Sequence, residues 1–189
     1  MVLGSAALVL AVGPTVYLRL AARGFPPDTT PEGAYVRVVL AVTDDKLGAA
    51  FAYLETDAQW AVFTALDYER KMADLVAASY PEPERSRLLA DLEDARQASG
   101  TEDYFARLAR RLGFVTRLRR DLSGVAKVEV AGERATVETA RGTRSACRRR
   151  ENGIWGLTLF SGELRARAER ASRDVVVIER AAADYRTPR

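Results

Sequence analysis

The spacing of apolar residues changes at Ser123 and Gly124, and this change limits the possible folds more than any other feature. Between residues 31 and 122, apolar side chains recur every three or four positions, as in amphipathic helices. Between residues 125 and 160 they alternate with polar ones, as in strands with one buried face. Helical spacing returns at Ser161. The sequence predicts an α+β fold, in which a helical N-terminal half packs on a four-stranded antiparallel meander that a long C-terminal helix follows.

Capping residues mark where the first helices begin. Thr30 precedes Pro31, which combines a preferred N-cap residue with the proline that suits the first helical position. Residues 56–59, Thr-Asp-Ala-Gln, form the pattern of a capping box before a longer helix. We expect that helix to bury Trp60 and Phe63.

The predicted strands can pair in two registers, which differ in where the arginines point. A two-residue turn after Ala140 would direct Arg144 and Arg148 into the core. A three-residue loop that includes Ala140 pairs Ala135 with Cys147 and leaves the arginines outside. Because a one-residue slip exchanges the two faces, burial favours the second register. The face it buries carries Val128, Val130, Ala135, Val137, Cys147, Trp155, Leu157 and Leu159.

Residues 2–18 carry no charged side chain. This run lies at the lower end of the length that crosses a bilayer, and it also fits the apolar region of a signal peptide. We therefore divide the chain into a signal or anchor at residues 1–24, a proline-rich linker at 25–32 and a single domain at 33–189. The alternative is an apolar helix that packs on the domain.

The predicted location is the bacterial inner membrane or the periplasm, with the membrane reached through the N-terminal segment. Arg19 and Arg23 follow the uncharged run, whereas no Lys or Arg precedes it. By the positive-inside rule, this arrangement would keep the body of the protein in the cytoplasm. The orientation therefore stays open.

Composition excludes several chemistries. The chain has no histidine and one cysteine, Cys147, so it lacks the usual neutral-pH base, every Ser-His or Cys-His nucleophile and any cysteine metal cluster. We expect no metal and no cofactor. The net charge of +3 is small, and the basic stretches are not interleaved with aromatic residues, so we expect no nucleic acid partner.

Residues 34–160 resemble the NTF2-like (cystatin-like) superfamily, in particular its uncharacterised bacterial envelope members with an N-terminal anchor. The resemblance rests on the helix at residues 35–42, the Thr-Asp-Asp break at 43–45, the helix end at 51–54 and the aromatic-rich helix from Trp60, with a curved sheet downstream. It implies a cone-shaped pocket between sheet and helices, which some members use for catalysis and many for binding ligands or partners. Extra helices and a final helix in place of a strand depart from the family pattern.

An enzyme resembling ketosteroid isomerases or dehydratases would need a carboxylate base and a tyrosine or acid donor in an apolar cavity. The best candidates are Asp67, Tyr68 and Tyr53. The alternative places Asp67 on a polar helix edge and the tyrosines at the rim of the core. No motif singles these residues out, so the sequence favours a non-catalytic protein and leaves the enzyme hypothesis open.

Two surfaces are candidates for binding. One is basic and could bind anionic lipid, or could be an ordinary solvated face paired with acids; its residues are Arg107, Arg110, Arg111, Arg117 and Arg120. The other lies in the C-terminal helix, where four consecutive apolar residues at 175–178 exceed one helical stripe. Val176 and Val177 would then contact a protein partner or a second copy in a homodimer, unless the helix is surrounded by its own domain.

These observations predict a membrane-tethered or exported accessory domain that binds a protein partner or a small apolar ligand without turnover. The alternatives are the carboxylate-based enzyme and the lipid-binding basic surface.

Overall fold

The computed structural model describes residues 25–187, so the predicted signal or anchor at residues 1–24 lies outside the described range. The helical elements are α2 (Pro31–Thr43), α3 (Leu47–Ala50), the short 3-10 helix η1 (Phe51–Tyr53), α4 (Thr56–Ser79), α5 (Glu84–Asp91), α6 (Glu93–Gln97), α7 (Thr101–Arg111), α8 (Phe114–Asp121) and α9 (Ser161–Arg186). The strands are β1 (Val125–Ala131), β2 (Arg134–Thr139), β3 (Arg144–Arg149) and β4 (Trp155–Leu157). The predicted α+β fold is confirmed.

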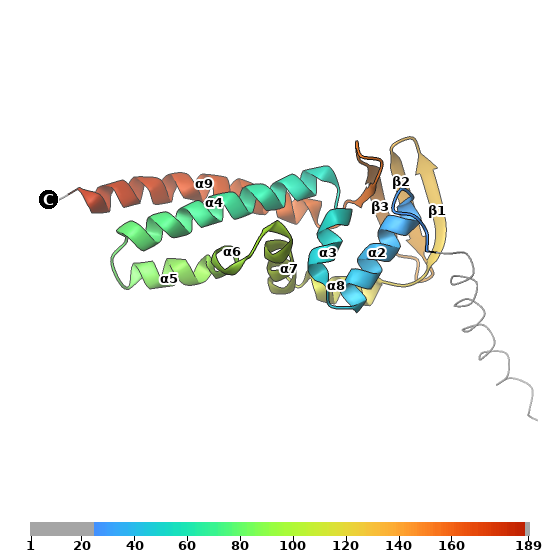
Figure 1. Cartoon of the computed structure of the whole chain (residues 1–189), viewed down its shortest axis with the longest axis horizontal. Helices are drawn as coiled ribbons and strands as arrows, with labels where there is room; N and C mark the ends of the chain where they lie inside the picture. The colour runs from blue at the N-terminus through green and yellow to red at the C-terminus, as the bar shows by residue number, and fades with distance from the viewer. Residues whose placement is uncertain (1–24, 188–189) are drawn as a thin grey trace, which may run out of the picture.

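The elements form two parts, which we call the head and the arm (Figure 1). The head contains the sheet with α2, α3, η1, α7, α8 and the first turns of α4 and α9. The arm contains the remainder of α4 and α9, with α5 packed on α4. Across residues 25–187, no helix has both the length and the apolar character needed to span a bilayer.

The sheet is a meander in the order β1-β2-β3-β4, with every neighbouring pair antiparallel. The predicted register is confirmed, because Ala135 pairs with Cys147 and Cys147 with Leu157. Arg144 and Arg148 are exposed, as that register requires. The expected burial of Val130 is wrong: it lies near the end of the edge strand β1 and is exposed.

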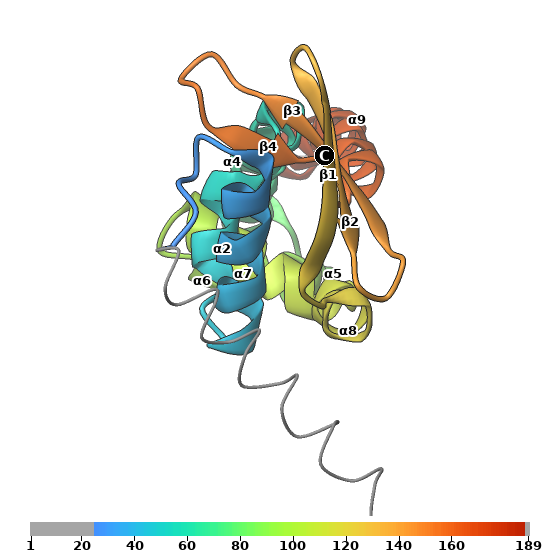
Figure 2. The ribbon, with the colours of Figure 1, turned by 90° about the vertical axis from the view of Figure 1, so that its right-hand side faces the viewer.

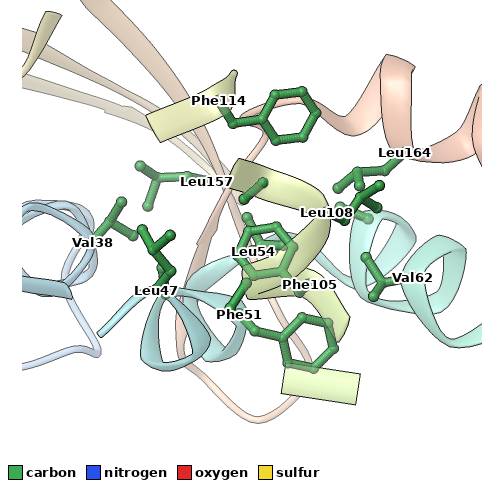
Figure 3. Packing of buried hydrophobic residues seen from close by; sticks show 14 of the residues in the cluster. Val38, Leu47, Phe51, Leu54, Val62, Phe105, Leu108, Phe114, Leu157 and Leu164 are labelled. Atoms are coloured by element: carbon green, nitrogen blue, oxygen red, sulfur yellow. The ribbon is translucent and has the colours of Figure 1, made fainter. Parts of the chain in front are cut away.

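The core of the head joins the inner face of the sheet to the helices, with α2 running along one side of the sheet (Figure 2). Leu157 of β4, Leu54 and Leu108 of α7 are fully enclosed there (Figure 3). Val38 reaches this cluster from α2, and Leu164 reaches it from the start of α9.

The predicted cap of α2 is confirmed, whereas α4 begins at Thr56, within the predicted capping box, without the predicted side-chain cap. The Thr30 hydroxyl accepts a hydrogen bond from the Gly33 N–H at 3.1 Å, which caps α2. At α4 the N-cap residue is Glu55 and no side chain caps the helix. The Glu55 N–H instead donates to the Leu157 carbonyl at 3.0 Å, so a contact with β4 determines where α4 begins.

The predicted burial of the aromatic residues at the start of α4 is wrong. Trp60 is 65% exposed and Phe63 is also exposed. The buried face of α4 follows a three- and four-residue spacing that both aromatic residues miss; it includes Ala58, Val62, Ala65, Glu69, Met72 and Val76. The face of α4 that tertiary packing buries is therefore the one that lacks Trp60 and Phe63.

Helices α4 and α9 run in the same direction along the arm. The Arg167 guanidinium contacts the Glu69 carboxylate at 2.7 Å, and further along the Tyr80 hydroxyl donates to the Ile178 carbonyl at 3.3 Å. The buried residues of α9 repeat with the same spacing as those of α4, which is the seam of a coiled coil; they include Leu164, Ala168, Ala171, Val175 and Ala182.

A buried ion pair lies in this seam where the arm meets the head. The Glu69 side chain is only 5% exposed, and the Arg167 Nε donates a hydrogen bond to the Tyr104 hydroxyl at 3.0 Å. Burial, and secondarily the Glu69 charge, raises the pKa of Tyr104 well above its ordinary value. Tyr104 therefore stays neutral and accepts from the guanidinium.

Gly156 permits the contact between β4 and the start of α4. A Cβ at this position would lie 2.6 Å from the Leu54 carbonyl oxygen and from the Glu55 Cα, both of them backbone atoms. We expect Gly156→Ala to lower the free energy of unfolding by about 1–3 kcal/mol, because the backbones must separate. Gly162→Ala is the control, since nothing lies within 4 Å of its Cβ position. Urea denaturation measures both variants, and equal stability of the two would contradict this account.

Candidate functional site

An apolar groove lies on the head between α2 and the segment that joins α8 to β1. Its volume is about 640 Å³. Val36, Val39 and Leu40 line it from α2, and Leu122 and Val125 line it from the opposite side.

The groove exists because α2 is apolar on more than one face. The face with Tyr35, Val38 and Val42 packs into the head core. Val36, Val39 and Leu40 lie on the neighbouring face, which no described helix or strand covers completely; Leu40 is exposed. A helix that is apolar around most of its circumference is normally buried on every side. Because one apolar side of α2 is only partly covered, a further apolar group can pack there.

Polar groups at the groove are few. The Tyr35 hydroxyl donates to the Ser123 carbonyl at 3.2 Å, and burial raises the pKa of Tyr35 above its ordinary value. Arg119 is the one charged side chain among the described lining residues, and it lies 3.8 Å from the Asp45 carboxylate. No carboxylate lines the described groove, so it lacks the base that the enzyme hypothesis places in such a cavity.

The structure does not bring the candidate catalytic residues to this groove. Asp67 is exposed on α4, and Tyr68 packs in the arm beside Met72. Tyr53 lies in η1, where the Arg37 guanidinium is 5.9 Å from its ring centroid. An exposed Asp67 lacks the apolar surroundings that the enzyme hypothesis requires.

Each arginine of the candidate basic surface lies near a carboxylate. The pairs are Arg107 with Asp103 at 3.3 Å, Arg110 with Asp45 at 3.5 Å, Arg111 with Asp94 at 2.8 Å, Arg117 with Glu163 at 3.0 Å and Arg120 with Asp121 at 2.9 Å. Most of these groups are well exposed, so each pair adds little stability. These pairs match the alternative interpretation of the basic surface, in which it is an ordinary solvated face paired with acids.

The arginines of the outer sheet face have a mixed-charge environment. The Arg148 guanidinium lies 3.3 Å from the Glu55 carboxylate, whose side chain is almost fully buried. An open hollow of about 580 Å³ beside this pair is lined by Arg134 and Arg165 but also by Glu129. Three arginines (Arg134, Arg148 and Arg165) therefore line the hollow together with two glutamates (Glu55 and Glu129), so acids offset most of its positive charge.

Val176 and Val177 are exposed on α9, with 51% and 66% of their surfaces accessible. Sequence reasoning found this surface but missed the groove, although the signal was of the same kind. Residues 38–42 form five consecutive apolar positions, which is also more than one helical stripe buries.

No protein-family model, curated protein or solved structure matches this chain. The resemblance to the NTF2-like superfamily therefore stays a prediction.

Cys147 provides an internal check on the packing between sheet and helices. It is a free thiol on the inner face of β3 and is almost completely buried. Burial raises its pKa from about 9 to about 12. The native thiol is therefore protonated near neutral pH and inaccessible to reagents.

We expect the Cys147 thiol to react with a maleimide only after unfolding. Because the raised pKa belongs to the folded state, the unfolded chain releases its proton first as the pH rises from about 9 to about 12. Over that range Cys147 should reduce stability by roughly 1.4 kcal/mol per pH unit. Urea denaturation at several pH values, with Cys147→Ala to subtract other titrations, measures this slope. Identical slopes in the two proteins would contradict the buried position of the thiol.

Proposed function

We propose that this chain is a membrane-tethered or exported bacterial accessory domain that binds a small apolar ligand in the groove, without turnover. The observation that carries the proposal is the apolar lining of a groove of about 640 Å³. This volume is in the range of known small-molecule sites, which are mostly apolar with a few polar groups that fix orientation.

The lining also suggests the kind of ligand. Val39, Leu122 and Val125 offer contacts to a hydrocarbon body. Arg119, at the edge of the same groove, offers a positive charge to an anionic head group. A single-chain fatty acid combines the two properties, because its chain is apolar and its carboxylate is charged.

The position of the groove is consistent with the proposed membrane tether. Phe25 and Pro26, the first two described residues, line it. The uncharged residues 2–18 precede them in the sequence by a few positions. A domain anchored by that segment would carry its groove close to the bilayer, where fatty acids partition.

A thiol-protection experiment tests the ligand. Leu40→Cys adds an accessible thiol at the groove to a chain whose own thiol is buried. In the purified full chain, oleate at ten times its dissociation constant should slow maleimide labelling roughly tenfold, since about a tenth of the sites stay empty.

Thr116→Cys is the matched control, because Thr116 is exposed on α8 outside the groove. Its labelling rate should not change with oleate. Equal rates with and without oleate at both positions would reject the fatty acid. Protection of Leu40→Cys in cell membranes but not by oleate would indicate an apolar segment of a protein partner instead.

Cell fractionation tests the tether separately. We expect the full chain in the carbonate-washed membrane fraction or in the periplasm, because of the uncharged run at residues 2–18. Deletion of residues 2–18 should move it to the soluble cytoplasmic fraction. Recovery of the intact chain in that fraction would contradict the proposal.

A further inference from the structure

The outer face of α9 is open along the arm. One side of α9 packs on α4, and in Figure 1 α9 forms an edge of the arm. Val177 lies on the open side and is 66% exposed, and charged residues lie about one and two helical turns away from it in both directions.

Four of the charged residues around Val177 form pairs of opposite sign at equal distances from it, whereas the exposed Arg173, four positions before it, has Ala181 as its counterpart. Asp174 precedes Val177 by three positions and Arg180 follows it by three. Arg170 precedes it by seven positions and Asp184 follows it by seven. Residues at these spacings share one helix face.

These four charged residues are available for a partner. Each of them is exposed. Within residues 25–187, none of them forms an ion pair. This contrasts with Glu179 on the side of α9 nearer α4, which pairs with Lys71 at 2.6 Å.

We propose that this face binds a second copy of the chain, α9 against α9 in antiparallel orientation, with the two-fold axis at Val177. Arg170 then faces the partner's Asp184, and Asp174 faces the partner's Arg180. Symmetry repeats both pairs on the other side of the axis, and Val177 packs against the partner's Val177. The surface is complementary to itself, which is what an isologous interface requires.

The same charges disfavour a parallel pair of α9 helices. In-register parallel packing would place Arg170 beside the partner's Arg170 and Asp174 beside the partner's Asp174. Like charges at such positions repel, so the charge pattern selects one orientation. A single helix–helix contact lies at the low end of interface sizes, so the dimer is weak and weakens further in high salt.

The proposed contact between two α9 helices does not depend on the groove or on its ligand. Val177→Cys tests this contact in the purified full chain, with copper-phenanthroline as the oxidant that forms an intermolecular disulfide. The native Cys147 is buried and does not compete. Val176→Cys is the matched control, because Val176 is similarly exposed but lies off the axis. We expect Val177→Cys to form the covalent dimer about tenfold faster, since the interface holds its two thiols together; equal rates would overturn the proposal.

Charge reversal tests the register in the Val177→Cys background. Asp174→Arg alone places two positive charges together at each pair, and Arg180→Asp alone places two negative ones. Each should slow crosslinking about fivefold or more, as like charges do across an interface. The double variant restores both pairs with reversed signs, and its rate should return to within about twofold of the starting value. Circular dichroism confirms that each variant is folded, and a double variant as slow as the single ones would overturn the proposed register.

Discussion

The parallel packing of α4 and α9 determines most of the architecture. Two neighbouring helices that run in the same direction cannot be joined by a short loop, so the chain must return from the tip of the arm before α9 begins. With 24 residues, α4 is about 36 Å long. Helices α5 to α8 and the sheet make up that return, and the groove lies where the return reaches β1. The buried pair of Glu69 and Arg167 holds the two helices in register, and removal of one partner of such a pair typically costs about 3–5 kcal/mol.

Two apolar runs in this chain are longer than one helical stripe can bury. Their surplus apolar residues lie in different surroundings. The run at residues 38–42 lies in α2, where its second face leaves an open groove beside β1. The run at 175–178 lies in α9, where Val175 enters the seam and Val177 is exposed among charges. The first arrangement suits an apolar molecule, whereas the second suits a surface with a matching pattern of charge. Apolar residues in excess of one buried stripe thus mark both surfaces, and the surrounding charges distinguish one surface from the other.

The sequence predicted the features that depend on periodicity and local chemistry. The change of period at Ser123 gave the fold class, and the three-residue loop at Ala140 gave the strand register. Features that depend on long-range contacts were not predictable in this way. Glu55 is buried because β4 accepts its N–H and Arg148 lies beside its carboxylate. Trp60 is exposed because tertiary packing buries a different face of α4, which carries Ala58, Val62 and Ala65. The groove was not predicted, because helical spacing alone does not show whether another element covers the second apolar face of α2.

The described chain begins beside the sheet and ends at the tip of the arm, so its two ends lie at opposite extremes of an elongated molecule (Figure 1). The 26 residues of α9 extend about 39 Å. Antiparallel α9 helices would place the two heads at the far ends of a dumbbell, with both grooves distant from the symmetry axis. If residues 2–18 anchor each chain as proposed, two anchors so widely separated would make such a dumbbell lie flat along a bilayer, with both heads at the same depth.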